Sequence, residues 1–277
     1  MPVSDSINSH GLYDGVLTNS LPRGGSALLA ETVEMLGYRE TQKETRLNYR
    51  TARKLAGTRR NETDTEKKIG VSPYSPWYLD SSVFRDWLKA VERGQGISVH
   101  IPHTPALSPV IKELNYCHVL IMRDPGAVLA ALIFADEMPL HFLDADFETL
   151  SPAMRLRFMA EGGYAAKADA KVKSFAEVYR SMLAWRNDPD CLTVCYEELA
   201  GELGFQKQRE AVKSIASHLH AEFDDDIFEK LNRADSSWAE KFRTGRMEEW
   251  KPAVDPESLE YIIAYCRPLC TEAGYKQ

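Results

Sequence analysis

Four short apolar segments recur along the chain, separated by residues with the spacing of amphipathic helices. The first precedes a glycine turn and a helical pattern over residues 26–36, which ends at Gly37. The third is a continuous apolar run, as expected of a strand buried on both faces. The predicted strands comprise residues 15–21, 96–101, 119–122 and 191–196. Alternating strands and helices predict an α/β fold, with a central, mostly parallel sheet flanked by helices.

Polar or charged residues come at or directly after the end of each predicted strand. Ligands of open parallel sheets bind at the carboxyl ends of the strands. The candidates at this edge are residues 22–26, His100, Arg123 and Tyr196. We therefore expect these segments to meet around one site.

The turn Pro22-Arg23-Gly24-Gly25-Ser26, between a strand and a helix, is suited to an anion. Its backbone N–H groups and the partial positive charge of the helix N-terminus favour phosphate or sulfate. Arg23 adds a permanent charge, and Ser26 adds a hydroxyl group. The lysine of the Gly-Lys-Ser/Thr loop of nucleotide triphosphatases is absent. An ordinary connection between a strand and a helix has the same form, so this turn needs further support.

Composition narrows the function classes. The chain has 277 residues, which fits one large domain or two small ones, and its 44% of apolar residues are typical of a globular protein. The net charge of −7 argues against general binding of nucleic acid. Residues 1–15 lack the pattern of a signal peptide. The longest apolar run, residues 127–135, is too short to cross a bilayer. We expect a cytoplasmic protein with no membrane anchor.

The five cysteines predict free thiols, because their number is odd and no secretion signal is present. The pairs Cys191/Cys195 and Cys266/Cys270 are each four residues apart, but neither has a partnering histidine cluster, so no metal site is predicted. Ten cations lie between Arg39 and Lys68, which indicates either a solvated helix and loop or a rim that attracts anions. These cations are Arg39, Lys43, Arg46, Arg50, Arg53, Lys54, Arg59, Arg60, Lys67 and Lys68.

Several motifs together resemble the sulfotransferase family that uses 3′-phosphoadenosine 5′-phosphosulfate (PAPS), in its cytosolic, small-molecule form. Residues 21–29 are similar to the family's 5′-phosphosulfate loop, and Ser98-Val99-His100-Ile101-Pro102 is similar to its Lys-Thr-His-Leu-Pro segment. The resemblance covers nearly the whole chain and implies a single domain over residues 1–277 with a P-loop-like three-layer fold. It implies that His100 is the catalytic base. The implied ligands of the 5′-phosphosulfate are Arg23, Gly24, Gly25, Ser26 and Ala27.

Three further segments resemble the family's binding elements for the 3′-phosphate and adenine. Residues 120–125 resemble the strand that ends in a phosphate-binding arginine, which implies this role for Arg123. Residues 194–199 are similar to the Tyr-Glu-Asp-Leu segment, which places Tyr196 beside the adenine. Residues 242–250 look like the loop that closes over the 3′-phosphate, which implies this role for Arg243 and the backbone of Thr244 and Gly245 and leaves Trp250 to packing.

Four positions depart from the family pattern. Leu28 replaces an aromatic residue near the adenine, and Ser98 replaces the lysine before the histidine. Ala131 replaces a serine, and Thr244 replaces the lysine of the Arg-Lys-Gly loop. The complete set of 3′-phosphate ligands and the stacking partner of adenine therefore stay open.

The leading hypothesis is transfer of a sulfuryl group from PAPS to a hydroxyl or amine of a small acceptor, with PAP as the second product and no metal. His100 would accept the acceptor's proton and Arg23 would stabilise the departing phosphate. His103 is the rival base. The alternatives are a P-loop kinase or triphosphatase with a degenerate loop, and a non-catalytic protein that binds PAPS or PAP.

The acceptor site is expected in two segments near residues 39–78 and 137–164, which lie between the donor motifs and provide walls or lids. Carboxylates in the second segment either recognise a cationic acceptor or are solvated. They are Glu137, Asp144, Asp146 and Glu148. The sequence does not determine the acceptor or the oligomeric state.

Overall fold

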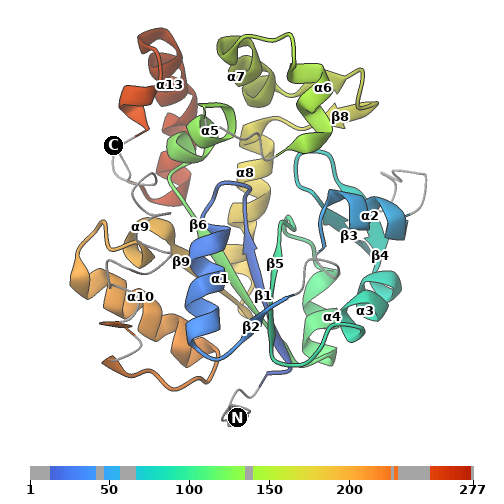
Figure 1. Cartoon of the computed structure of the whole chain (residues 1–277), viewed down its shortest axis with the longest axis vertical. Helices are drawn as coiled ribbons and strands as arrows, with labels where there is room; N and C mark the ends of the chain where they lie inside the picture. The colour runs from blue at the N-terminus through green and yellow to red at the C-terminus, as the bar shows by residue number, and fades with distance from the viewer. Residues whose placement is uncertain are drawn as a thin grey trace, which may run out of the picture.

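Five parallel strands form the central sheet, in the order β2-β5-β1-β6-β9 (Figure 1). The computed structural model describes residues 13–41, 47–56, 67–134, 140–225, 228–229 and 250–275. The strands are β1 (Gly15–Ser20), β2 (Arg39–Glu40), β5 (Gln95–Val99), β6 (Tyr116–Met122) and β9 (Cys191–Cys195). The parallel sheet and its four predicted strands are confirmed. Tyr196 begins a helix instead of ending a strand, and β6 begins at Tyr116 instead of Val119.

Helices cover both faces of the sheet, because successive side chains of each strand point to opposite sides. On β1, Leu17 belongs to one buried apolar cluster and Val16 to the other; Leu120 and Val119 divide in the same way on β6. The cluster with Val16 is covered by α1 (Ser26–Met35), α9 (Tyr196–Leu199) and α10 (Phe205–His218). The predicted three-layer arrangement is therefore confirmed.

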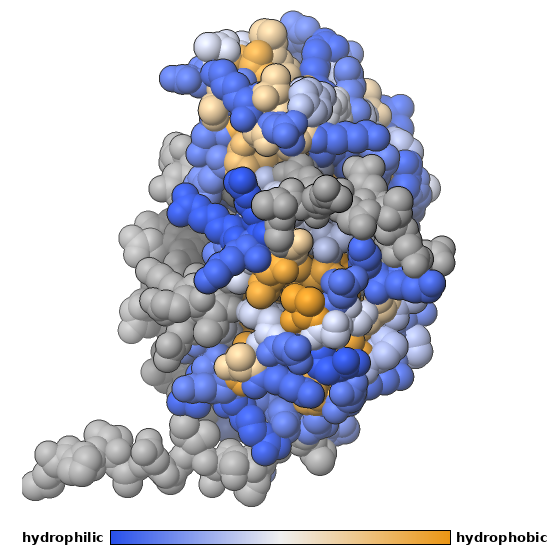
Figure 2. Space-filling model, turned by 90° about the vertical axis from the view of Figure 1, so that its right-hand side faces the viewer, coloured by the Kyte–Doolittle hydropathy of each residue, from blue (hydrophilic) through white to orange (hydrophobic). Residues whose placement is uncertain are grey.

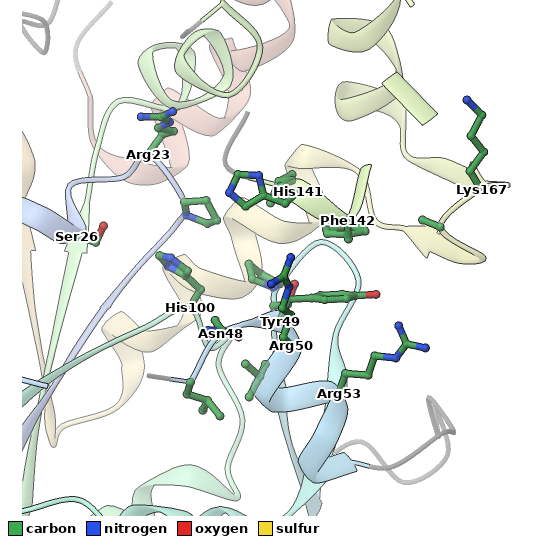
Figure 3. A pocket seen from close by; sticks show the side chains of 17 residues that line it. Arg23, Ser26, Asn48, Tyr49, Arg50, Arg53, His100, His141, Phe142 and Lys167 are labelled. Atoms are coloured by element: carbon green, nitrogen blue, oxygen red, sulfur yellow. The ribbon is translucent and has the colours of Figure 1, made fainter. Parts of the chain in front are cut away.

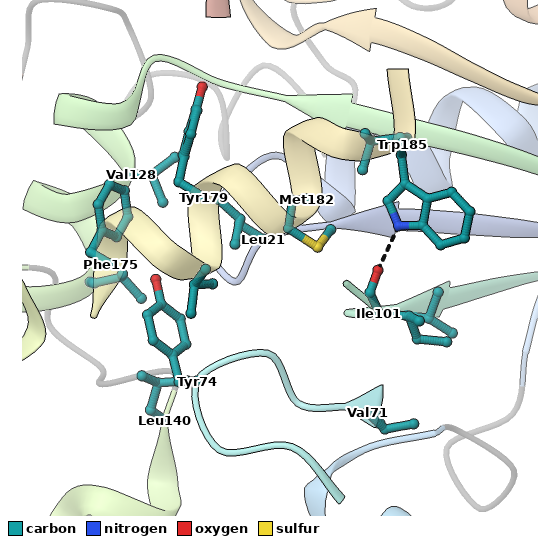
Figure 4. Packing of buried hydrophobic residues seen from close by; sticks show 14 of the residues in the cluster. Leu21, Val71, Tyr74, Ile101, Val128, Leu140, Phe175, Tyr179, Met182 and Trp185 are labelled. Atoms are coloured by element: carbon teal, nitrogen blue, oxygen red, sulfur yellow. Dashed lines mark hydrogen bonds between the residues drawn. The ribbon is translucent and has the colours of Figure 1, made fainter. Parts of the chain in front are cut away.

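The larger cluster, which contains Leu17, joins the opposite face of the sheet to a second group of helices. These are α3 (Ser81–Lys89), α4 (Leu107–Glu113), α5 (Pro125–Phe134), α7 (Pro152–Glu161), α8 (Phe175–Leu183) and α13 (Pro256–Ala273). Ser151, Ser174 and Asp255 cap the N-termini of α7, α8 and α13 with their side-chain oxygens. Trp185, on the 3₁₀ turn η4 (Ala184–Asn187), is fully buried in this cluster beside α8 (Figure 4).

Shorter elements surround the carboxyl end of the sheet. They are α2 (Tyr49–Ala56), the hairpin of β3 (Lys68–Val71) and β4 (Trp77–Asp80), η3 (His141–Leu143), α6 (Asp144–Phe147), the hairpin of β7 (Gly163–Ala165) and β8 (Ala170–Val172), and η5 (Lys251–Ala253). Figure 2 shows the side on which α2, β3 and β4 lie, where hydrophilic side chains border an apolar area. The sequence pattern predicted neither the hairpins nor β2, a two-residue exposed edge strand.

All five cysteines are free, as predicted. Burial raises the pKa of Cys117 and Cys195 to about 12, so these thiols stay protonated near neutral pH. Within the described ranges, no cluster of three or more His, Cys, Asp or Glu side chains is arranged to hold a metal ion. No helix in the part of the chain that the structure describes has the length and apolar character needed to span a membrane.

Candidate active site

A cavity of about 1000 Å³ lies at the carboxyl end of the sheet (Figure 3). The turn after β1 contributes Pro22, Arg23 and Ser26 to its wall, and His100 lines it directly after the end of β5. Residues 47–50 and Arg53, residues 71–73, residues 140–142, Lys167 and Ala168 form the rest of the described lining. The tertiary fold therefore brings the predicted phosphate turn and the predicted base together at one cavity.

The turn after β1 ends in a helix N-terminus that no side chain caps. The N–H of Gly24 donates to the carbonyl of Leu21 at 2.8 Å, which closes a β-turn with Pro22 and Arg23 at its centre. Arg23 has a φ of 64°, and Gly25, the N-cap of α1, has a φ of 109°. Glycine has no side chain to cap the helix, and N–H groups in a first turn have no intrahelical partner. This end of α1 therefore suits an anion.

Gly25 is required both by its backbone conformation and by the Tyr196 ring packed against it. A Cβ atom at Gly25 would lie 2.5 Å from Cδ2 of Tyr196. Gly37 is the matched control, because its φ is 102° but no described atom lies within 4 Å of a Cβ built there. We expect Gly37→Ala to lower the free energy of unfolding by about 1 kcal/mol through backbone strain alone. Gly25→Ala is expected to lower it by about 2–4 kcal/mol, because overpacking is added.

Urea denaturation of the two variants measures this difference. Equal losses at Gly25 and Gly37 would show that the Tyr196 ring moves aside without cost, which contradicts the close packing.

Arg123 and Tyr196 lie together beside this turn. The guanidinium carbon of Arg123 lies 4.4 Å from the centre of the Tyr196 ring, and Nη1 of Arg123 donates to the carbonyl of Arg23 at 3.3 Å. Tyr179 donates its hydroxyl hydrogen to the carbonyl of Arg123 at 3.0 Å. Arg123, suggested for the 3′-phosphate, thus contacts both Arg23, suggested for the 5′-phosphosulfate, and Tyr196, suggested for the adenine. The three residues follow three different strands.

Glu197 connects this region to the C-terminal part of the chain, a role that the sequence did not reveal. Its carboxylate is buried and accepts hydrogen bonds from the N–H of Asp124 at 2.8 Å, from the hydroxyl of Tyr275 at 3.0 Å and from Sγ of Cys195 at 3.0 Å. The backbone after Arg123 is thereby tied to β9 and α9. In the sequence, Glu197 looked like an ordinary acidic residue at a helix start, since its partners are distant in the chain.

The hydrogen bond of His100 determines which ring nitrogen is available at the cavity. Nδ1 lies 2.7 Å from the carbonyl oxygen of Ser20, so Nδ1 carries the hydrogen and donates it, and Nε2 keeps its lone pair. Burial lowers the pKa of His100, and the bond to Ser20 opposes this only partly. His100 is therefore neutral near pH 7, in the tautomer that a base at Nε2 requires.

Asn19 and Trp185 hold the backbone next to His100. The side-chain amide of Asn19 donates to the carbonyl of Ile101 at 2.8 Å and accepts from its N–H at 3.0 Å. Nε1 of Trp185 donates to the same carbonyl at 2.9 Å. The rival base, His103, packs its ring edge-on against Trp185 with the ring centres 4.8 Å apart, and it is not among the described residues that line the cavity. This geometry favours His100.

Solved structures with a similar arrangement identify the fold. Mouse sulfotransferase SULT7A1 in complex with PAP aligns with a TM-score of 0.53 at 20% identity, covering 94% of this chain and 86% of the mouse chain. Retinol dehydratase with androsterone and inactive cofactor PAP aligns with a TM-score of 0.52 at 15% identity, covering 98% of this chain and 85% of the retinol dehydratase chain. This chain has the sulfotransferase fold. Retinol dehydratase with retinol and PAP aligns with a TM-score of 0.53 at 13% identity, covering 98% of this chain and 86% of the retinol dehydratase chain.

In comparisons of sequence, no family model and no curated protein matches the chain. The fold therefore agrees with the resemblance seen in the motifs, whereas the roles of individual residues in this sulfotransferase-fold chain stay proposals.

The positions that depart from the sulfotransferase family pattern lie in different parts of the structure. Leu28 is buried in the smaller apolar cluster, and Ser98 pairs with Thr18 through their hydroxyl groups at 3.1 Å. Ala131 is half-buried on α5. Arg243, Thr244 and Gly245 lie outside the described residues. Trp250 packs against the larger apolar cluster, and a Cβ atom at Gly126 would lie 3.3 Å from its ring.

The carboxylates suggested for a cationic acceptor bind other groups of this chain. Asp144 pairs with His141 at 3.5 Å, and Asp146 accepts from the N–H groups of Lys167 and Ala168, each at 2.9 Å. Glu148 lies 3.8 Å from Nζ of Lys167. None of these three lines the described part of the cavity. The fourth suggested carboxylate, Glu137, lies outside the described residues.

Proposed function

We propose that this chain is a PAPS-dependent sulfotransferase that transfers a sulfuryl group to a hydroxyl or amine of a small-molecule acceptor. One observation carries the proposal: the uncapped N-terminus of α1 and the imidazole of His100 meet at one cavity. The first suits the phosphosulfate end of the donor and the second suits an acceptor that must lose a proton. The PAP-containing structures with this fold support the same donor.

The donor is proposed to bind the residues that surround the turn after β1. The 5′-phosphosulfate would bind the N–H groups of Gly24, Gly25, Ser26 and Ala27 with the side chain of Arg23, and the 3′-phosphate would bind Arg123. Tyr196 would lie by the adenine. Arg243 and the backbone of Thr244 and Gly245 are proposed to complete the 3′-phosphate site.

The proposed chemistry is an in-line displacement at sulfur. The acceptor's oxygen or nitrogen forms a bond to sulfur as the bond from sulfur to the 5′-phosphate oxygen breaks. Nε2 of His100 takes the acceptor's proton, and Arg23 stabilises the negative charge that develops on the departing phosphate of PAP. Because the arginine and the N–H groups of the turn neutralise this charge, the proposed step includes no metal.

The acceptor is proposed to bind between the two segments near residues 39–78 and 137–164. Residues 47–50, 71–73 and 140–142 supply cavity wall from these segments. The androsterone and retinol bound in the solved neighbours support a small molecule as the acceptor. Within the single proposed domain, these segments would cover the acceptor as walls or lids. The cytoplasmic location stays a prediction.

A nucleotide-binding experiment tests the donor site. We expect PAP to bind at least about tenfold more tightly than adenosine 5′-monophosphate, because only PAP carries the 3′-phosphate for Arg123. Arg123→Ala should remove most of this preference. Isothermal titration calorimetry measures both ligands, with Arg209→Ala as the control, since Arg209 pairs with Asp225 on the surface. No heat from PAP in the unmodified protein would refute the donor assignment, and magnesium-dependent ATP turnover would favour the kinase alternative.

A further inference from the structure

The acceptor side of the cavity is cationic. Of the described residues that line the cavity, four are arginine or lysine and none is aspartate or glutamate. Arg23 belongs to the donor turn, whereas Arg50 and Arg53 come from α2 and Lys167 from the connection between β7 and β8. The chain as a whole carries a net charge of −7, so this local excess of positive charge is opposite in sign to the protein's overall charge.

An aromatic wall lies next to these cations. The rings of Tyr49 and Phe142 are stacked with their centres 4.9 Å apart and an angle of 4° between their planes. The ring of Trp77 meets Tyr49 edge-on at 5.8 Å. These contacts join α2, η3 and the β3–β4 hairpin, so the wall is supported from three elements. Such a surface suits a flat apolar group.

Arg50 is the cation best placed to meet an acceptor at His100. In the view of Figure 3, the Arg50 side chain overlaps Tyr49 on the side toward His100, whereas Arg53 and Lys167 lie on the side away from His100. Two of the other basic groups already have carboxylate partners: Lys167 lies 3.8 Å from Glu148, and His141 lies 3.5 Å from Asp144. Arg53 lies over the Trp77 ring at 5.8 Å.

We infer that the acceptor is an anion: a small molecule with a flat apolar body and a carboxylate, sulfate or phosphate group that binds Arg50. The inference rests on the proposed sulfotransferase function and specifies its substrate class. The acceptor's hydroxyl or amine faces Nε2 of His100, its flat body lies along Tyr49 and Phe142, and its anionic group pairs with the guanidinium. Transfer adds a sulfuryl group and leaves the acceptor's proton on His100, so the product carries one more negative charge.

Matched acceptors with and without the charge test this inference. The probes are 3-(4-hydroxyphenyl)propanoate and 4-(hydroxymethyl)benzoate, each paired with its uncharged methyl ester. Ligand-observed NMR measures their dissociation constants with and without PAP, and mass spectrometry follows the sulfated products with PAPS. We expect a carboxylate to exceed its ester by about tenfold or more in affinity or in kcat/KM, as a charge-assisted hydrogen bond provides.

Variants of Arg50 separate acceptor recognition from donor binding. Arg50→Ala should reduce the preference for the carboxylate to below about threefold and leave PAP affinity unchanged, and Arg50→Lys should keep most of the preference. Arg209→Ala, on the surface at Asp225, is the matched control and should behave like the unmodified protein. Loss of PAP affinity in Arg50→Ala would overturn the inference, because Arg50 would then serve the donor.

The remaining outcomes are equally decisive. Equal affinity for ester and carboxylate, an Arg50→Ala variant with an unchanged preference, or no detectable carboxylate binding each overturns the anionic acceptor. If esters are sulfated as well as carboxylates, the enzyme assignment stands and the acceptor class fails. If neither PAP binding nor any sulfated product is found, the proposed function fails, whereas carboxylate binding measured without nucleotide still tests the cationic cavity.

Discussion

Replacement of His100 by asparagine is expected to lower kcat by about 10²–10⁴-fold, the contribution typical of a positioned base. The asparagine amide can still donate to the carbonyl of Ser20, which Nδ1 of His100 contacts at 2.7 Å, but it offers no basic lone pair. The fold and PAP affinity should therefore stay unchanged. Mass-spectrometric product formation with PAPS gives kcat, and calorimetry gives PAP affinity for the same preparation.

The matched control for this substitution is His103→Asn, since His103 packs on Trp185 away from the described cavity lining. The control should keep most of the activity. Full turnover by His100→Asn would reject His100 as the base, and a large loss confined to His103→Asn would transfer the role to that residue. A protein that merely binds PAP would show no sulfated product in any variant.

The pH profile gives a second test of His100. Burial lowers its pKa from the ordinary value of 6.5, so the neutral imidazole persists below that pH. We expect kcat/KM to be maintained as the pH falls through 6.5 and to decrease only at lower pH, where the folded imidazole takes up a proton. The unfolded chain binds this proton at a higher pH than the folded protein does. The free energy of unfolding is therefore also expected to decrease as the pH falls below 6.5. An inflection above 6.5 would contradict the burial of this base.

Trp185→Ala is expected to lower the free energy of unfolding by about 3–5 kcal/mol, a large fraction of a typical domain's stability. Trp185 is fully buried, and its Nε1 donates to the carbonyl of Ile101 at 2.9 Å (Figure 4). The ring of His118 meets the Trp185 ring edge-on, with the ring centres 4.6 Å apart. Removal of the ring leaves a cavity beside the backbone that follows His100. We therefore expect kcat to fall as well.

Trp185→Phe separates packing from the hydrogen bond, because phenylalanine fills most of the volume but cannot donate to Ile101. Its expected loss is about 1–3 kcal/mol, arising from the lost Trp185 hydrogen bond and the smaller ring, while the carbonyl of Ile101 keeps its hydrogen bond from Asn19. Urea denaturation gives both free energies at constant m-value. A loss below about 1 kcal/mol for Trp185→Ala would show that the core collapses around the gap, which contradicts tight support of Ile101 by this ring.

Local pattern was sufficient for the main elements of the fold. The apolar run at residues 119–122 predicted a central parallel strand, and every residue of β6 is buried, with its apolar side chains divided between the two apolar clusters. Burial on both faces removes the polar alternation of a half-exposed strand, so this signal is strong. The edge strand β2 was missed, because Arg39 and Glu40 are exposed and polar and carry no burial signal.

The candidate site depended more on contacts between distant residues. Arg23 and His100 were predicted from their motifs, and the chain order of strands made a common edge the natural expectation. Asn19 and Glu197 were not singled out, although Asn19 holds the backbone of Ile101 and Glu197 holds that of Asp124. A single asparagine or glutamate has the same local appearance in many settings, so its partners are visible only after folding.

The amino-acid sequence determined the three-layer fold, the glycine turn after β1 and the histidine that follows β5, because these depend on residue type and spacing within short segments. Tertiary structure alone decided that Nδ1 of His100 donates to Ser20, that Arg123 stacks on Tyr196, and that Arg50 stands beside an aromatic wall. The contact between His100 and Ser20, for example, joins residues that are 80 positions apart. The physical basis of these relations is packing and hydrogen bonding across the carboxyl edge of the sheet, which no local pattern encodes.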